Sequence, residues 1–504
     1  MQKKLYLFGC LLFTISSLFA QKITYTEPEK DDTRQLNFEI IGKVSGNILL
    51  YKNVRDDHFI SKYDQGMKLL DKNKLDFIPE RLINADFLSY NEHSYMIYQY
   101  QKKNIVYCMA AKIDGNGKVV GEPVQMDTTQ ISFWASNKIY TVMNSDDKKK
   151  VAVFKVNTKN EKIHFLTTSV FDENLNLLKK DLMAIAMPER HDYLTEFTID
   201  NDGDIVFLKA TNQGFEDNIY KLELLIKPLQ SPSLVAYPVS LKNVYIDDVR
   251  VKTDNTNKRF LITSFYSKSR RNNIDGLYSF IWDKSSGQGV VATGTLFSDD
   301  LRSDVRNGNA SKTAFNDFFL RNMTMRNDGG YIITAESIST LRRGGNSTSR
   351  WNYFSPYYSP YEYQSFGRYS YMYPWAGRSA FAQTTRYFAD NVLVLSFDNT
   401  GKLEWSNLIR KSQYDDNTDS FLGYSMINTG SDLHFLFNMQ EKKALILNNQ
   451  EIDAEGQIKR NPTFKNLDKG YEFMPRYGKQ IGSKTIIVPC QYRNYICFAK
   501  VELS

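Results

Sequence analysis

The chain is poor in the residues that metal centres and nucleophilic catalysis use. It has 4 cysteines and 5 histidines among 504 residues. The histidines are far apart and lack metal-ligand spacing such as His-Glu-x-x-His; they are His58, His93, His164, His191 and His434. There is no Gly-x-Ser-x-Gly nucleophile turn, phosphate-binding glycine loop or paired-cysteine metal motif. We therefore expect no metal and no cofactor, and the sequence identifies no catalytic residue.

One acidic segment resembles the start of a calcium-binding loop, because Asp200, Asp202 and Asp204 occupy alternate positions. A complete loop of that kind needs Gly at its sixth position and Glu at its twelfth. Ile205 and Thr211 stand at those positions instead. We therefore expect this segment to be a hairpin turn with solvated carboxylates.

Long apolar runs are missing after the first twenty residues, so we expect no transmembrane segment. The start of the chain combines Lys3 and Lys4 with the apolar stretch 5–13 and the small residue Ala20, which is the layout of a signal peptide. Cys10 resembles a lipidation site, but the apolar core continues past it. We expect residues 1–20 to be removed and the chain to be exported, to the periplasm or to the outer membrane or extracellular space.

Charge of one sign is not concentrated anywhere in the chain. The net charge is +7, and basic and acidic residues are interspersed. Nucleic-acid binders instead gather Lys and Arg on one surface. The sequence therefore predicts no nucleic-acid partner.

Three cysteines lie beyond the signal peptide: Cys108, Cys490 and Cys497. If Arg493 and Asn494 form a two-residue turn, Cys490 and Cys497 stand directly opposite on a hairpin, within reach of a disulfide. Export would permit that bond, and two buried thiols are the other interpretation. Cys108 is expected to be a buried apolar residue.

What the sequence does contain is a degenerate repeat with a period of about fifty-five residues. Each copy of the repeat contains an apolar residue, then an Asp, then a turn with Gly or Asn. The Asp residues of the copies are Asp64, Asp114, Asp172, Asp283, Asp398 and Asp453. Successive Asp positions differ by 50, 58, 111, 115 and 55. The difference of 111 holds a degenerate copy near Pro228, and that of 115 holds inserted loops.

Each of these turns is preceded by a pair of alternating apolar segments with a polar turn between them, which is typical of a β-hairpin. The pairs span 38–51, 87–98, 131–142, 197–208, 249–265, 319–335, 421–437 and 473–491. The chain is rich in strand-favouring aromatic residues, with 32 Tyr and 32 Phe. No segment shows helical periodicity sustained over three turns.

Four short antiparallel strands in each repeat predict an all-β fold, a single β-propeller domain over residues 21–504. Eight strand pairs, each followed by another pair, indicate eight four-stranded blades, or seven if one unit is only a long connection. The last unit, from about residue 472 to residue 503, has three strands. We expect segment 22–26 at the mature N-terminus to supply the fourth strand and close the ring.

Two motifs support this fold by resemblance. Asp328-Gly-Gly-Tyr331, followed later by Asp398 with Gly401 and Trp405, is similar to the hairpins of secreted bacterial β-propeller repeats. Ser396, Asp398, Gly401 and Trp405 also resemble the Asp-box of sialidase-type propellers, with one extra residue in the turn. In such families these motifs form hairpins, so the resemblance implies a fold and no activity.

Long insertions in the repeat are expected to gather on one face. They span 340–390 between the second and third strands of the sixth unit, 298–316 before that unit, and 268–273 in the fifth unit. The first is rich in Tyr and Arg, a composition that suits recognition. Its candidate binding residues are Trp351, Tyr353, Tyr357, Tyr358, Tyr361, Tyr363, Arg368, Tyr369, Tyr371, Tyr373, Trp375 and Arg378.

These features predict an exported, non-enzymatic binding or scaffold protein that contacts a partner protein at the cell envelope. A glycan-binding or glycan-hydrolysing propeller is the alternative, because propeller glycosidases gather carboxylates from separate blades. A loop that packs over the blades and binds nothing is a third interpretation. The acidic residues on or near the same face are Glu336, Glu362, Asp299, Asp300 and Asp304.

Overall fold

A computed structural model describes most of the chain from residue 22 to residue 503. The described ranges are 22–30, 36–54, 57–79, 82–135, 137–160, 162–212, 218–308, 311–342, 385–416, 418–441, 444–464, 467 and 470–503. Within them the structure has thirty-six strands, one α-helix, α1 (Asp299–Val305), and one 3-10 helix, η1 (Pro475–Tyr477). Among the described helices, none is long and apolar enough to cross a membrane.

The strands follow one another as antiparallel meanders of four. Unit one comprises β3 (Leu36–Val44), β4 (Asn47–Val54), β5 (Asp57–Tyr63) and β6 (Leu69–Lys74). Unit two comprises β7 (Leu82–Ser89), β8 (His93–Lys102), β9 (Ile105–Asp114) and β10 (Val124–Gln130). Unit three comprises β11 (Thr141–Asn144), β12 (Lys150–Asn160), β13 (Ile163–Asp172) and β14 (Leu177–Ala186). Unit four comprises β15 (Asp192–Ile199), β16 (Ile205–Asn212), β17 (Ile219–Lys227) and β18 (Val235–Val239).

The second half repeats the pattern. Unit five comprises β20 (Arg250–Asp254), β21 (Arg259–Ser267), β22 (Gly276–Asp283) and β23 (Gln288–Leu296), and β19 (Tyr245–Ile246) joins it to unit four in one nine-stranded sheet. Unit six comprises β24 (Phe318–Met325), β25 (Tyr331–Arg342), β26 (Thr385–Phe397) and β27 (Leu403–Ile409), with β28 (Tyr414–Asp416) added to β26. Unit seven comprises β29 (Ser425–Asn428), β30 (Leu433–Glu441), β31 (Ala444–Ile452) and β32 (Ile458–Phe464). Unit eight comprises β33 (Glu472–Phe473), β34 (Lys479–Gly482), β35 (Thr485–Tyr492) and β36 (Tyr495–Glu502), with β1 (Lys22–Tyr25) and β2 (Glu29–Lys30) paired to β36.

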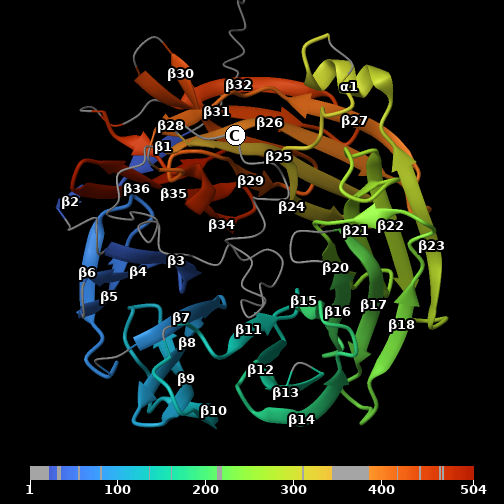
Figure 1. The fold of residues 1–504 in the computed structure, drawn as a ribbon. Coiled ribbons are helices and arrows are strands. Elements are labelled where there is room, and N and C mark those ends of the chain that lie inside the picture. The colour runs from blue at the N-terminus through green and yellow to red at the C-terminus, as the bar shows by residue number, and fades with distance from the viewer. Residues whose placement is uncertain are drawn as a thin grey trace, which may run out of the picture.

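The units follow one another around a ring, with the first strand of each towards the middle (Figure 1). First strands of neighbouring units contact each other, as β3 does with β7 and β15 does with β20. The red C-terminal strands lie beside the blue N-terminal ones, where β34 contacts β3. β1 pairs with β36 from Lys22↔Glu502 to Tyr25↔Ala499. The all-β propeller architecture is therefore confirmed, and the pairing on which the predicted closure depends is present.

The apolar core lies between the units. The central strands of the units are buried along most of their length, as β16 and β22 are, so both faces of each sheet are apolar there and must be covered by neighbours. One cluster joins units one and two through Tyr51 and Phe87, and another joins units eight and one through Phe498 and Phe38. Six further clusters fill the remaining junctions between consecutive units of the described chain. Each unit is therefore stabilised by both of its neighbours.

The repeated Asp residues lie in the turns between third and fourth strands, as the sequence predicts. In unit three the carboxylate of Asp172 accepts hydrogen bonds from the backbone amides of Asn174 (2.9 Å) and Asn176 (2.8 Å). In unit six Asp398 does the same for Thr400 and Lys402, and Gly401 takes the left-handed φ of +81° that the turn requires. The motif therefore forms a hairpin turn.

One predicted hairpin is wrong. Residues 131–142 were expected to be the first strand pair of unit three, because their apolar and polar residues alternate. The described residues 131–135 and 137–140 form a link instead, and the pair is β11 and β12, with its turn at 145–149. Two buried glutamines of β8 hold the link: Gln101 accepts from the amide of Ala135 (2.8 Å), and Gln99 accepts from that of Tyr140 (2.8 Å). These long-range bonds satisfy backbone groups that a strand would otherwise have paired.

Because strand directions alternate, the loops between second and third strands share one face with the links between units. We call this the loop face, and the opposite side the turn face. Two of the three insertions meet on the loop face. Segment 298–316 contains α1, and Asn316 donates to the side chain of Asn273 (2.7 Å) in the fifth unit's loop. Arg302 of α1 donates to the carbonyl of Ile274 (3.0 Å). The predicted crowding of these two segments is confirmed.

Candidate functional site

The largest insertion leaves the loop face on a three-stranded stem, formed by the ends of β25 and β26 together with β28. The two long strands pair from Ile338↔Ala389 to Arg342↔Thr385, beyond the last residue that β24 pairs. β28 pairs with the same part of β26. The structure therefore places the insertion between the second and third strands of unit six, as expected.

The predicted binding residues themselves are not placed. Trp351, Tyr353, Tyr357, Tyr358, Tyr361, Tyr363, Arg368, Tyr369, Tyr371, Tyr373, Trp375 and Arg378 all lie in 343–384, outside the described residues, as does Glu362. What can be described is the stem and the surface from which it rises.

The stem carries a fixed ion pair and an exposed aromatic ring. Arg386 of β26 contacts both carboxylate oxygens of Asp416, at 2.7 Å through Nε and 3.0 Å through Nη2. The same guanidinium lies 4.9 Å from the ring centre of Tyr414, whose side chain is 58% exposed. A bidentate pair and a cation–π contact together fix the direction in which β28 and β26 leave the sheet.

Beside the stem, carboxyl groups hold their protons more tightly than usual. The pKa of Asp415 is raised to about 6, mainly by burial and to a smaller extent by the nearby carboxylates of Glu472 and Asp419. Burial also raises the pKa of Glu472, and that of Asp390 where β26 meets the sheet. Raised carboxyl pKa values are common at functional sites, although structural networks produce them too.

Beneath the stem lies a charge network centred on the buried side chain of Glu336 of β25. One carboxylate oxygen is 2.8 Å from Lys411 Nζ and the other is 2.8 Å from Arg321 Nη2. Lys411 Nζ also donates to the carbonyl of Ala389 (2.6 Å) and to the side chain of Gln413 (2.9 Å). Burial opposes ionisation of Glu336, but Lys411 and Arg321 outweigh it and lower its pKa to about 2.

A second network crosses the inner strands of units four, five and six. Arg250 of β20 contacts Glu196 of β15 at 2.9 Å and Asp248 at 3.1 Å. Asp248 also accepts from the backbone amide of Leu320 in β24 (2.8 Å). Burial raises the pKa of Glu196 to about 7, against the opposing effect of Arg250.

Sequence reasoning named Glu336 but missed its partners and the whole Glu196–Arg250–Asp248 set. Glu196 has a φ of +55° and lies at a register shift of β15, and Arg321 lies at one in β24. Such bulges redirect a side chain and cannot be read from alternation. The sequence contains one indication of this ion pair: Glu196 and Arg250 are 54 residues apart, which is the length of one repeat.

Glu336 and Glu196 are therefore each held by a cation, Glu336 by Lys411 and Arg321 and Glu196 by Arg250. The other acids expected on this face have structural positions as well. Asp299 and Asp300 occupy the first turn of α1 after the N-cap Ser298, where they favour the helix. Asp304 pairs with Arg410 at the end of unit six.

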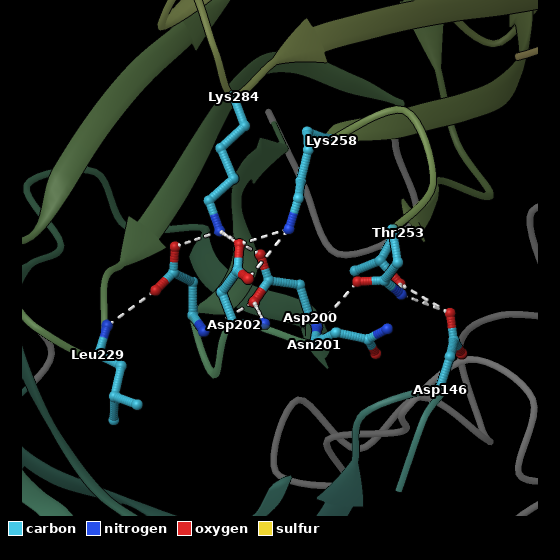
Figure 2. Close-up of polar contacts among 10 residues, drawn as sticks. Asp146, Asp200, Asn201, Asp202, Leu229, Thr253, Lys258 and Lys284 are labelled. Atoms are coloured by element: carbon cyan, nitrogen blue, oxygen red, sulfur yellow. Dashed lines mark hydrogen bonds and ion pairs between the residues drawn. The ribbon is translucent and has the colours of Figure 1, made fainter. Parts of the chain in front are cut away.

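On the turn face, the calcium-like segment holds an ammonium group. Lys284 Nζ, from the turn between β22 and β23, lies 2.6 Å from Asp200, 2.7 Å from Asp202 and 2.7 Å from Asp204 (Figure 2). Lys258 approaches Asp202 at 2.9 Å from the other side. The segment forms the predicted hairpin turn. Asp202 is exposed, but Asp200 and Asp204 are buried against Lys284, so the expectation of solvated carboxylates is wrong for these two.

The same network continues sideways across units three, four and five. Asn201 donates its backbone amide to the side chain of Asn255 (2.8 Å), which donates in turn to Asp146 (2.7 Å) (Figure 2). Asp146 also pairs with Lys252 at 3.1 Å. These bonds connect the turns between the first and second strands of units three, four and five, and so join neighbouring units on the turn face.

The described residues form no metal-binding cluster, and their cysteines are free thiols in this structure. No group of three or more His, Cys, Asp or Glu side chains there could hold a metal ion. Cys490 and Cys497 are register partners on the β35–β36 hairpin, with Arg493 in its turn, as the sequence predicts. Both are buried thiols in this structure, as is Cys108, and burial raises the pKa of Cys490. Their disulfide stays a prediction.

Comparisons with known proteins do not assign a family. No protein-family model matches the chain, and no curated protein matches it. Prolyl oligopeptidase B from Galerina marginata is a similar solved structure, with 8% identity over 92% of this chain and a TM-score of 0.40. An ulvan lyase of polysaccharide lyase family PL25 has 10% identity over 82% of this chain and 90% of its own, with a TM-score of 0.37.

An uncharacterized protein from Listeria monocytogenes has 9% identity over 88% of this chain and 98% of its own, with a TM-score of 0.36. The chain spans 56% of the length of the prolyl oligopeptidase. TM-scores this low carry no argument, so the architecture rests on the strand pairing and core of the chain itself. The resemblance to particular propeller repeats stays a prediction.

Proposed function

We propose that this chain is an exported, non-enzymatic binding protein that uses the insertion 343–384 to engage a partner protein at the cell envelope, in the periplasm or at the outer membrane. The observation that carries the proposal is the stem. The Tyr- and Arg-rich residues 343–384 connect the ends of its two long strands, and the stem is fixed by the Arg386–Asp416 pair and by the buried Glu336 network beneath it. A rigid base lowers the entropy that a long loop loses on binding.

The test replaces 343–384 by Asn-Gly. Arg342 and Thr385 are register partners, so a two-residue turn can close the stem without disturbing the sheet. Envelope proteins captured by the purified mature chain and by this variant are quantified side by side, after thermal melting shows that both fold. We expect specific captured proteins to be lost with the insertion. Capture of the same proteins in the same amounts by both chains would contradict the proposal.

A matched control keeps the insertion and loosens its base. Arg386→Gln with Asp416→Asn removes the bidentate pair on the exposed stem, where such a pair contributes at most about 1 kcal/mol to stability. We expect this variant to melt like wild type and to capture the same proteins less efficiently.

A glycan-active propeller is the second candidate, and one observation favours it. Asp415, with its pKa raised by burial to about 6, and Glu472 lie beside the stem, and such a carboxyl can serve as a general acid near neutral pH. If the chain cleaves glycans, envelope polysaccharide incubated with it should release new reducing ends. Asp415→Asn should abolish that release without changing the fold.

A further inference from the structure

The link between units two and three exposes two consecutive aromatic side chains on the loop face. Phe133 is 61% exposed and Trp134 is 60% exposed. Ile105, at the start of β9 on the same face, is 37% exposed. Large apolar side chains that protrude together are uncommon on soluble surfaces and mark sites of interaction.

This pair stands on a backbone that is fixed at several points. Gln101, itself buried, donates to the carbonyls of Phe133 (3.0 Å) and Lys103 (2.9 Å) and accepts from the amide of Ala135 (2.8 Å). The amide of Ile131 donates to the carbonyl of Asn104 (2.8 Å). The two rings are therefore presented by a rigid link, and the turn with Lys103 lies directly beside it.

The surroundings of the pair are basic. Lys102 and Lys103 are exposed in the turn between β8 and β9, and Lys138 is partly exposed in the link. Neither segment 99–107 nor segment 128–141 contains an acidic residue. Asp127, the carboxylate nearest in the chain, is buried and paired with Lys155 at 2.8 Å. The patch is thus apolar at its tip and positive around it.

We propose that this patch, defined by Ile105, Phe133, Trp134 and the three lysines, docks the loop face onto an anionic lipid surface. Trp and Phe enter the interface between headgroups and acyl chains, while lysines beside them are attracted to anionic headgroups. The positive charge of the two segments and their lack of carboxylates favour an anionic surface over a neutral sugar. The proposal is independent of the partner assigned to the insertion 343–384.

The test measures co-sedimentation of the mature chain with phosphatidylcholine vesicles containing phosphatidylglycerol, and with pure phosphatidylcholine vesicles. We expect binding to the anionic vesicles that falls with salt and is at least about tenfold weaker in Phe133→Ala with Trp134→Ala, because the buried ring area is lost. Lys102→Gln with Lys103→Gln should reduce the preference for anionic vesicles. Leu182→Ala, which truncates a 68% exposed side chain on β14, is the matched control and should bind like wild type.

A spectroscopic readout locates the contact. In the chain with 343–384 replaced by Asn-Gly, vesicle binding should persist and Trp134 emission should shift to the blue, a shift absent in Trp134→Phe. No binding to anionic vesicles, or equal binding by the Phe133→Ala, Trp134→Ala variant, would overturn the proposal. A third result would also overturn it: wild type binds polygalacturonate but no vesicles, and the Phe133→Ala, Trp134→Ala variant loses the polygalacturonate binding. The patch would then be a glycan site. If vesicle binding is lost when 343–384 is removed, the lipid contact lies in that segment and not in the patch, and the proposal is wrong.

Discussion

Buried charged residues inside the ring occur in sets of opposite charge, and each favours the folded state only while its partners are present. Glu336 and Lys411 are almost fully buried and Arg321 is largely buried, so water cannot readily replace the contacts of the Glu336 carboxylate. A buried ion pair adds little net stability over apolar packing, but removing one member leaves the others uncompensated. These residues are therefore expected to be sensitive to substitution.

Glu336→Gln should lower the free energy of unfolding by about 3–5 kcal/mol at pH 7, because Lys411 and Arg321 lose their counter-charge. The pKa of Glu336 is lowered from 4.5 to about 2 in the folded chain. Its contribution is therefore present above pH 4.5 and disappears as the pH falls towards 2. Urea unfolding at pH 7 and pH 3 measures both effects. A variant that keeps the acid sensitivity of wild type would show that other carboxyl groups carry it.

The three thiols beyond the signal peptide should be unreactive while the chain is folded. Cys490 and Cys497 are almost fully buried, as is Cys108, and burial raises the pKa of Cys490, so little thiolate forms. With reduced protein at pH 8, we expect Ellman's reagent to label none of them natively and all of them in guanidinium. Labelling of Cys490 and Cys497 in the native state would contradict the packing of the last hairpin.

At the scale of elements, turns are predictable from local residues and links are not. The Asp-containing turns could be located because the carboxylate of Asp172 or Asp398 bonds to amides two and four residues away. The link 131–142 was misread because its apolar alternation is local, whereas Gln99 and Gln101 that hold it come from another strand. The place of the insertion between the second and third strands of unit six could be predicted, but its stem could not: the pairing of β25 with β26 continues to Arg342↔Thr385, inside the range 340–390 that the sequence predicts to be loop.

The turn of Lys284 shows how one side chain can join two units. Lys284→Met should lower the free energy of unfolding by about 2 kcal/mol, because three carboxylates lose a shared charged donor. Lys258→Met is the matched control: Lys258 meets only Asp202 and is half exposed, so a loss below about 1 kcal/mol is expected. Equal losses in thermal or urea unfolding would mean that the Lys284 network is no more than surface charge.

At the scale of the whole molecule, the ring depends on contacts between residues about one repeat apart or at the two ends of the chain. The sequence predicted the repeat and the terminal pairing. It could not predict the charge networks, because Arg250 meets Glu196 only when two units pack and a bulge turns the side chain. A search for complementary charges one repeat apart would have proposed that pair.

The N-terminal segment joins the two ends of the chain by backbone and by charge. β1 pairs with β36, and the amide of Thr26 donates to the carbonyl of Phe498 (3.0 Å). Further along, Glu29 is 3.0 Å from Lys52 Nζ of unit one, and only 2% of the Lys52 side chain is exposed. Segment 22–30 therefore covers the edge of unit eight and neutralises a buried cation of its neighbour.

Removing residues 22–30 from the mature chain should cost more than either interaction alone. The edge of β36 would be left unpaired and open to association with other chains, and the Lys52 ammonium would lose a counter-charge. We expect the truncated chain to melt at lower temperature and to elute as oligomers in size-exclusion chromatography. Glu29→Gln isolates the second effect: it should remain monomeric but lose about 2–3 kcal/mol of unfolding free energy, with Lys52→Met in the same chain restoring part of the loss. A truncated chain that stays monomeric with an unchanged melting temperature would show that the ring is held without its N-terminal strand.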